Sequence, residues 1–523
     1  MPDNENTDMG STMLYSDRLT DGCLWLLYSV TGKMIMPELR QSRLCNRSET
    51  LILMAIHGAK KPDVLLLSVN YPAIDSEKDG ACGYIVNAAK ALIEVTGWHV
   101  RVIALRFGGQ KTYEENDRIS IHRLELPGKK NYRYDSDGAV DVPTFTHDFE
   151  SAVSTLARGA SESAAATGHR VPVLCHNCET ANAAAGLGNS GYPVVYVVHY
   201  LSAHELMFRF EAAEDPLRDS VAGLTLSSAA GMFCPRKYRP ALVRTLTLGA
   251  SVLSDIPLPR SLELLYRLRK EALLMNKAHL IVAMSPSSAS SIAEFYPAAR
   301  NKLRVAAAGP PAPASRSYWP FPGGSGRLRL VMVSRPVPWK GWHYVAEALK
   351  NLEKTSPELA GKLEFAAIGG LEEFGGAYGR RNSLELDGLR KVSFANLGDL
   401  PHPEVMEVMS AADALVLPSV FETFGLVTLE AMANGCMVLA SDADGPRDVV
   451  KAPWGIIMDF QDPKKRVSEI ERGILKLLSL SRDEMSTLGG EARAASLQYS
   501  WKKCAEAHAA ILEEARLLAA GGG

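Results

Sequence analysis

Two carboxylates flank a glycine-containing turn in the stretch SVFETFGLVTLEAMANG, residues 419–435. Glu422 and Glu430 are eight residues apart, with Gly425 between them. The preceding ALVLPS predicts a buried strand, and LVTLEAMA predicts a helix that starts near the glycine. The first N–H groups of a helix are unpaired and suit a phosphate, whereas carboxylates suit hydroxyl groups. The sequence therefore predicts a site for a ligand with sugar, phosphate and ribose in succession, with an ordinary amphipathic helix as the alternative.

Two basic residues follow another predicted strand in the same half of the chain. The stretch VSRPVPWKG places Arg335 and Lys340 directly after RLRLVMVS, residues 327–334. The forked donors of arginine and the point charge of lysine both suit phosphate oxygens. Basic residues in loops are usually only solvated, but ligands of parallel sheets bind at the carboxyl ends of the strands. We therefore expect both residues to face the same ligand.

The elements that must position these residues alternate along the chain. From about residue 62, short apolar runs without strict alternation predict buried parallel strands, at 63–69, 98–105, 171–175, 192–199 and 279–285, with a helix at 83–94. The pattern stops at the Pro-, Gly- and Ser-rich stretch 309–326 and then starts again. We predict two α/β, Rossmann-like domains whose parallel sheets face a central cleft that holds the ligand.

The expected domain limits follow from this pattern. We assign residues 61–318 to an N-terminal acceptor domain, with a helical insertion at about 200–275, and residues 319–490 to a C-terminal nucleotide-sugar domain. Residues 1–60 are expected to be a partly disordered extension, and residues 491–523 a helix that packs back toward the N-terminal domain. Basic residues of the insertion predict a solvated cap, with a surface for an anionic acceptor or a membrane face as the alternative.

Composition excludes several classes of protein. A chain of 523 residues is too long for one ordinary domain, and its net charge of -2 gives no sign of nucleic-acid binding. Eight scattered cysteines favour a reducing cytoplasm, and the single C-x-x-C at 175–178 has no second pair for zinc. No apolar run is long enough to cross a membrane, and the start lacks the pattern of a signal peptide. We expect a cytoplasmic protein without a transmembrane segment, and peripheral membrane contact is not expected.

Several motifs occur in the order found in one enzyme family. ETFGLVTLE resembles the E-x7-E element, and VSRPVPWKG the R-x4-K-G element, of GT-B retaining glycosyltransferases of the family 4 type, also called glycosyl transferases group 1. YSWKKCAEAHAAILEEA resembles the closing helix of that family. The resemblance spans about residues 62–520 and is strongest over 328–460. It implies the GT-B fold, with the acceptor bound by the first domain and the nucleotide-sugar by the second.

The resemblance also implies roles for the donor-side residues. Glu422 would bind hydroxyls of the donor sugar, and Glu430 would hold the ribose hydroxyls. The backbone at Phe424, Gly425 and Leu426 would lie against the sugar and the diphosphate. Arg335 and Lys340 would neutralise the departing diphosphate, which is where charge develops during transfer.

On the acceptor side, the resemblance implies that His199, which ends the predicted strand YPVVYVVH, lies near the reacting sugar. GACGYIVN stands where the family has a glycine-rich loop, so Gly80 and Gly83 would let the backbone approach the phosphate and the acceptor. His176, in LCHNC, is expected to be an ordinary histidine at a strand end. Arg447-Asp448 stands where the family often has Pro-Glu, which bears on the identity of the sugar.

The reaction implied is front-face transfer with retention, in which the leaving phosphate helps to deprotonate the acceptor. No cofactor is expected, because the nucleotide-sugar is a co-substrate; UDP is the guess from family frequency, with GDP and ADP open. The acid triplets DAD at 442–444 and DSD at 135–137 resemble a metal-binding D-x-D, but we expect no metal. The acceptor is expected to be a small soluble molecule. A sugar phosphorylase and a non-catalytic sugar- or nucleotide-binding protein remain the alternatives.

Overall fold

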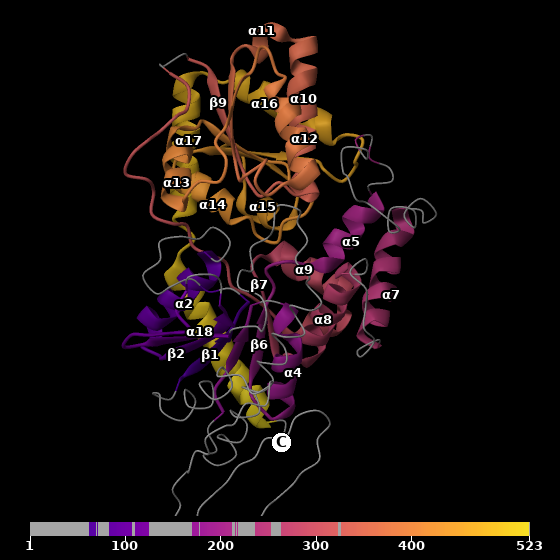
Figure 1. Ribbon diagram of the computed structural model, residues 1–523, viewed down its shortest axis with the longest axis vertical. Coiled ribbons are helices and arrows are strands. Elements are labelled where there is room, and N and C mark those ends of the chain that lie inside the picture. Colours follow the sequence, from indigo (N-terminus) through magenta and orange to yellow (C-terminus); the bar gives the residue numbers. More distant parts are fainter. Residues whose placement is uncertain are drawn as a thin grey trace, which may run out of the picture. The chain divides into compact units, whose positions relative to one another are not determined.

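The computed structural model (Figure 1) describes residues 62–69, 71, 83–106, 110–124, 170–176, 178–211, 215, 217, 236–252, 263–322 and 326–521. The predicted extension 1–60, Gly80 and the acid triplet at 135–137 lie outside these residues. The described helices include none that is both long enough and apolar enough to cross a membrane.

The first sheet of the described chain has eight strands in the order β3-β4-β2-β1-β5-β6-β7-β8. Their bounds are β1 Val64–Leu67, β2 Val100–Leu105, β3 Tyr113–Glu115, β4 Ile119–Leu124, β5 Val173–Cys175, β6 Val194–Val197, β7 Leu280–Ala283 and β8 Leu303–Val305. The β3–β4 pair is antiparallel and the other pairs are parallel. The predicted strands are confirmed, whereas β3, β4 and β8 were not predicted.

Both faces of this sheet are covered, which explains the unbroken apolar runs. Side chains of a strand alternate between faces, so Val64 and Leu66 join one hydrophobic cluster while Leu65 and Leu67 join another. The helices that follow the strands supply the rest of these clusters. They are α2 Gly83–Thr96, α4 Ala181–Asn189, α5 Ser202–Glu211, α7 Arg239–Val252, α8 Glu263–Lys277 and α9 Pro286–Phe295, with short helices η1 Cys178–Thr180, η3 Arg236–Tyr238 and η5 Pro297–Lys302.

The second sheet has six parallel strands in the described residues, in the order β11-β10-β9-β12-β13-β14. Their bounds are β9 Leu328–Val333, β10 Leu363–Ile368, β11 Ser393–Asn396, β12 Ala414–Leu417, β13 Met437–Ser441 and β14 Gly455–Met458. Counted along the chain this order is 3-2-1-4-5-6, the doubly wound arrangement. Its direction reverses between β9 and β12, and ligands of such sheets bind outside the carboxyl ends of the strands at this switch point.

Helices cover both faces of the second sheet as well. The helices in this half of the chain are η6 Pro338–Lys340, α10 Trp342–Thr355, α11 Pro357–Ala360, α12 Gly376–Asp387, α13 His402–Ala411, α14 Leu426–Ala433, α15 Asp444–Val449, α16 Arg466–Leu478, α17 Arg482–Ser496 and α18 Trp501–Gly521. Leu330 and Met332 face the cluster that contains residues of α10 and α16, and Val331 faces the opposite cluster. The prediction of an α/β protein with two parallel sheets is therefore confirmed.

The last helix returns to the first sheet. In Figure 1, α18 (yellow) lies beside α2 (indigo), and the Tyr84 hydroxyl of α2 is 2.7 Å from His508 Nε2 of α18. The guanidinium of Arg304, in β8, bonds the Glu514 carboxylate near the end of α18, with Nε donating at 2.9 Å. The closing helix thus joins the second half of the chain to the helix that follows β1.

Candidate active site

The loops that follow β9 and β12 touch one another at the switch point of the second sheet. The Val420 N–H donates to the Trp339 carbonyl at 2.7 Å. Gly341, with a positive φ of 80°, packs so closely that a Cβ atom there would lie 2.4 Å from the Pro418 carbonyl oxygen. Only glycine fits this position, because any side chain would collide with backbone. The close approach brings Lys340 of the first loop to Glu422 of the second.

Lys340 and Glu422 form an ion pair between these loops. The Lys340 Nζ bonds Glu422 Oε2, and their side chains are 19% and 14% exposed. The Ser419 hydroxyl lies 3.5 Å from the same carboxylate oxygen. Two residues predicted from separate motifs therefore meet in space, and both charged groups keep part of their surface open to a ligand.

The start of α14 adjoins this pair. Gly425 precedes the helix with a φ of 73°, in the left-handed region that favours glycine. A Cβ atom at Gly425 would lie 3.1 Å from Glu422 Cγ, so the aliphatic part of the Glu422 side chain lies close to the helix start. The buried Phe424 ring packs toward Tyr499, and the Gly445 N–H donates to the Glu422 carbonyl at 3.0 Å. The predicted helix start after Phe424 is confirmed.

Glu430 lies one turn further along α14, as predicted. Its Oε1 is 3.0 Å from Nε2 of His402, the first residue of α13. The hydrogen bond to Glu430 raises the pKa of His402, while burial opposes the shift. The sequence analysis did not include this histidine, and its position between two prolines gave no signal of a contact with the E-x7-E element.

Arg335 follows β9 in the same loop as Lys340. Arg335 is exposed, and its carbonyl oxygen accepts a hydrogen bond from the Trp342 indole N–H at 3.4 Å. This bond fixes the backbone of Arg335 against the start of α10 and leaves the guanidinium at the surface of the loop. Arg335 thus lies in the same loop as Lys340, and no described residue forms an ion pair with its guanidinium.

His199 follows β6, and its backbone contacts the E-x7-E loop. Its carbonyl oxygen accepts a 2.7 Å hydrogen bond from the Thr423 hydroxyl, so the first sheet meets the loop that carries Glu422. Its Nε2 is 2.9 Å from Nδ1 of the buried His176, and the Tyr84 ring meets it edge-on at 5.0 Å. Removal from water and the nearby His508 lower the pKa of His199 to about 3. His199 is therefore a neutral imidazole at neutral pH, and His176 is its partner rather than an isolated strand-end residue.

Fewer observations connect Gly83 and Cys175 with the site. Gly83 is the first residue of α2, and a Cβ atom there would meet no described atom within 4 Å. Burial raises the pKa of the Cys175 thiol to about 12, so this residue stays protonated. In the part of the chain that the structure describes, no group of three or more His, Cys, Asp or Glu side chains could hold a metal ion.

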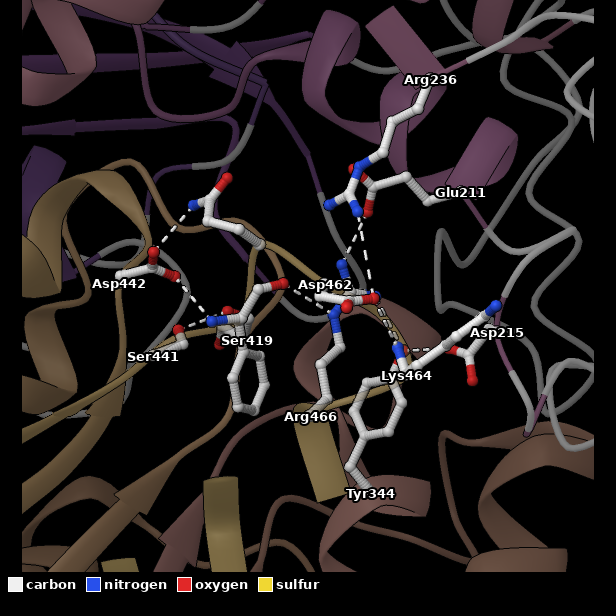
Figure 2. A network of polar contacts seen from close by, with 12 residues as sticks. Glu211, Asp215, Arg236, Tyr344, Ser419, Ser441, Asp442, Asp462, Lys464 and Arg466 are labelled. Atoms are coloured by element: carbon white, nitrogen blue, oxygen red, sulfur yellow. Dashed lines mark hydrogen bonds and ion pairs between the residues drawn. The ribbon is translucent and has the colours of Figure 1, made fainter. Parts of the chain in front are cut away.

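A second polar network joins the helical insertion to the second sheet (Figure 2). The Arg466 guanidinium, on α16, donates to Glu211 Oε2 at 2.6 Å, to the Tyr344 hydroxyl at 3.0 Å and to the Phe460 carbonyl at 3.0 Å. The Tyr344 hydroxyl in turn donates to Asp215. Arg466 is 2% exposed and its charge is balanced by Glu211 at the end of α5. These residues, none of which the sequence analysis included, hold α5 against the helix that follows Lys340.

Asp442, from the acid triplet at 442–444, has a structural role in this region (Figure 2). Its two carboxylate oxygens accept the Phe460 N–H at 3.1 Å and the Gln461 side-chain amide at 2.8 Å. The Ser441 hydroxyl before it donates to the Ser419 carbonyl at 2.5 Å. Asp442 therefore ties β13 to the loop after β14, and Ser441 supports the loop that carries Glu422.

Known proteins are similar to this chain in sequence and in fold. Residues 322–493 match the family model described as "Glycosyl transferases group 1". These residues belong to glycosyl transferases group 1. The match contains Arg335, Lys340, Glu422, Gly425 and Glu430, so the residues gathered at the switch point lie within the family's own segment.

Similar proteins extend the likeness to both sheets. The "D-inositol 3-phosphate glycosyltransferase" of Thermobispora bispora is 28% identical over 331 residues, which are 59% of this chain and 74% of the relative. Sucrose-phosphate synthase from Thermosynechococcus elongatus has a similar structure, with a TM-score of 0.61 at 17% identity over 87% of this chain and 99% of that one. Anabaena Alr3699/HepE, solved with UDP and glucose, has a TM-score of 0.54 at 16% identity over 87% and 100%. The fold is GT-B.

The sequence analysis also missed a cluster of aromatic rings beside the site. Trp339 and Phe421, the residues before Lys340 and Glu422, stack with ring centroids 5.4 Å apart and planes at 18°. The Tyr200 ring, next to His199, meets Phe421 at 5.7 Å. Lys340, Glu422 and His199 thus each have an aromatic neighbour in sequence. This adjacency was the signal in the sequence, because such pairs bury apolar surface beside groups that must stay in place.

Proposed function

We propose that this glycosyltransferase moves a sugar from a nucleotide-diphosphate sugar to a hydroxyl group of a small acceptor. One observation carries the proposal: the Lys340 ammonium, the Glu422 carboxylate and the start of α14 at Gly425 adjoin one another. A cation and a helix start suit the diphosphate, and the carboxylate beside them suits the hydroxyls of the attached sugar. The three groups match the three chemical parts of the donor.

In this proposal an ion pair holds the site together before the donor binds. Lys340 and Glu422 neutralise each other until the donor enters, when the diphosphate takes over the ammonium and a sugar hydroxyl donates to the carboxylate. Arg335, whose side chain has no ion pair among the described residues, adds a second cation beside the diphosphate. Glu430 accepts hydrogen bonds from the ribose hydroxyls.

The chemical step is proposed to be front-face transfer with retention. Negative charge develops on the departing diphosphate, and Lys340, Arg335 and the N–H groups of α14 stabilise it. The diphosphate oxygen accepts the proton of the acceptor hydroxyl as the new glycosidic bond forms and the old one breaks. His199 is neutral, so its role is to bind a hydroxyl of the donor sugar rather than to supply a proton. The step is proposed to need no metal, since cationic side chains take the place that a metal would fill.

The acceptor is proposed to be a phosphorylated sugar or cyclitol. The names of two similar proteins, a D-inositol 3-phosphate glycosyltransferase and a sucrose-phosphate synthase, both include a phosphate ester. The acceptor would approach from the first sheet, where His199 follows the carboxyl end of β6 and Gly83 begins α2. A uridine donor is the first choice to test, with guanosine and adenosine donors next.

The experiment is a matrix of donors and acceptors. The purified chain is incubated with UDP-, GDP- and ADP-glucose, each with D-inositol 3-phosphate, a hexose 6-phosphate or no acceptor, and release of the nucleoside diphosphate is measured. Proton NMR of the product gives the anomeric configuration, and EDTA tests the need for metal. Glu422→Gln should abolish turnover, while Glu513→Gln, at an exposed pair on α18, should not.

Three results would contradict the proposal. Turnover of a sugar 1-phosphate without any nucleotide would identify a phosphorylase. Donor binding without turnover, unchanged in Glu422→Gln, would identify a binding protein. Inversion at the anomeric carbon would refute the retaining step, and loss of activity in EDTA that a divalent cation restores would refute independence from metal.

A further inference from the structure

The contact between His402 and Glu430 joins two helices at the edge of the site. His402 is the first residue of α13 and Glu430 is the fifth residue of α14, and Nε2 lies 3.0 Å from Oε1. Their side chains are 28% and 17% exposed, so the pair is partly shielded but still open to a ligand. Within the described residues, His402 is the side chain that bonds the Glu430 carboxylate, which leaves Oε2 without a side-chain donor.

His402 occupies the first position of α13. The start of a helix carries positive partial charge, so a cation there is disfavoured and an acid is the usual choice. The bond to Glu430 raises the pKa of His402, while burial opposes the shift. The prolines on either side, Pro401 and Pro403, limit how far the backbone of His402 can move. A ring held in this way is suited to fix the orientation of its partner.

We propose that His402 is a positioning residue for recognition of the nucleotide ribose: it holds Oε1 of Glu430 so that the carboxylate faces the ribose 2′- and 3′-hydroxyls. This inference rests on the proposed function, in which Glu430 is the ribose-binding residue. A free glutamate side chain occupies several rotamers, and one that is already hydrogen bonded has less freedom to lose when the ligand binds. The carboxylate then accepts the ribose hydroxyls with its remaining lone pairs.

A purely structural role is the competing explanation. The pair could simply fasten α13 to α14, in which case its loss would weaken every ligand of the site equally. The two explanations differ in one observable, the dependence of the effect on the ribose hydroxyls. A positioning residue for ribose matters only when those hydroxyls are present.

The test compares nucleotides with and without the hydroxyls. Binding of UDP, GDP and ADP to the full chain is measured by calorimetry, and the tightest binder is compared with its 2′,3′-dideoxy counterpart. His402→Ala should weaken binding of the ribonucleotide about tenfold, the size expected for a lost charge-assisted hydrogen bond, and leave the dideoxy form within about twofold. His402→Gln, which keeps an N–H donor, should restore most of the loss. Glu404→Gln, a change of charge in the same helical turn, is the control.

Kinetics provide a second readout. His402→Ala should raise KM for the nucleotide-sugar with little change in kcat, because ribose is bound equally in the ground state and the transition state. Equal weakening of the ribonucleotide and the dideoxynucleotide, or no weakening of either, would overturn the role of His402 while leaving the proposed function intact. Failure of the unaltered chain to bind any of the three nucleotides would instead overturn the proposed function, and the role of His402 with it.

Discussion

Replacement of Gly425 by alanine tests whether the close packing at the start of α14 keeps the Glu422 side chain in position. The backbone has a φ of 73°, and the new Cβ would lie 3.1 Å from Glu422 Cγ and 3.2 Å from Thr428 Oγ1. Both contacts are tighter than a Cβ normally makes, so a neighbour must move by a few tenths of an ångström. Glu422 is the more mobile of the two, because Thr428 lies within α14 and is buried.

The size of the effect follows from these contacts. A non-glycine residue in the left-handed region costs about 1–2 kcal/mol, which lowers the melting temperature by a few degrees. Gly326→Ala provides the matched control, since Gly326 has a φ of 65° but a Cβ there would meet no described atom within 4 Å. Both variants should lose similar stability. Since misplacement of a reacting group by 1 Å costs about 10²-fold in rate, a shift of a few tenths of an ångström at Glu422 should cost about tenfold.

The assay is release of nucleoside diphosphate at several donor concentrations, together with thermal unfolding of both variants. Gly425→Ala should lose about tenfold in kcat/KM, whereas Gly326→Ala should stay within about twofold of the unaltered chain. Full activity in Gly425→Ala, despite a melting temperature as low as that of the control, would show that Glu422 is not positioned by this contact. The argument for a shared site at α14 would then fail.

Three further results are expected. Lys340→Met should lower kcat/KM by about 10²-fold or more, because a cation at the leaving group is lost, and a smaller effect in steady-state kinetics would contradict its role. Glu211→Gln should destabilise the chain by about 3 kcal/mol in chemical denaturation, since Arg466 is 2% exposed and would lose its balancing charge. Glu513→Gln, at an exposed ion pair, should cost less than about 1 kcal/mol. Burial lowers the pKa of His343 to about 3, so between pH 6.5 and 3 the unfolded chain binds more protons than the folded chain. The free energy of unfolding should therefore fall as pH falls through this window, by on the order of 1 kcal/mol per pH unit. The melting temperature of His343→Gln should depend less on pH over the same range.

Particular elements show why parts of the fold were predictable. The strands β1, β2, β6 and β9 are buried on both faces, so their apolar runs stand out in the sequence. The missed strand β4 is six residues long and buried, whereas the missed strands β3, β8 and β11 have exposed or half-exposed residues and are three or four residues long. Such short segments have the same composition as loops, and it is pairing with a neighbouring strand that makes them part of a sheet.

The candidate site shows the same division. Glu422, Glu430, Arg335 and Lys340 were identified because their spacing follows predicted strands and a helix start. His402, Arg466 and the stacked rings of Trp339 and Phe421 were not, because each acts through a residue far away in the chain. Glu211 and Arg466 are separated by 255 positions, and no local pattern links them.

By itself the sequence determined the alternation of strands and helices, the glycine at the start of α14 and the charges that follow β9 and β12. These features are local, because a strand, a helix start or a loop is specified by residues within a few positions of one another. Only the tertiary structure decided that Lys340 bonds Glu422, that His402 bonds Glu430 and that His199 is a neutral partner of His176. Such contacts depend on the order of strands in the sheets and on burial, which arise when distant segments pack together.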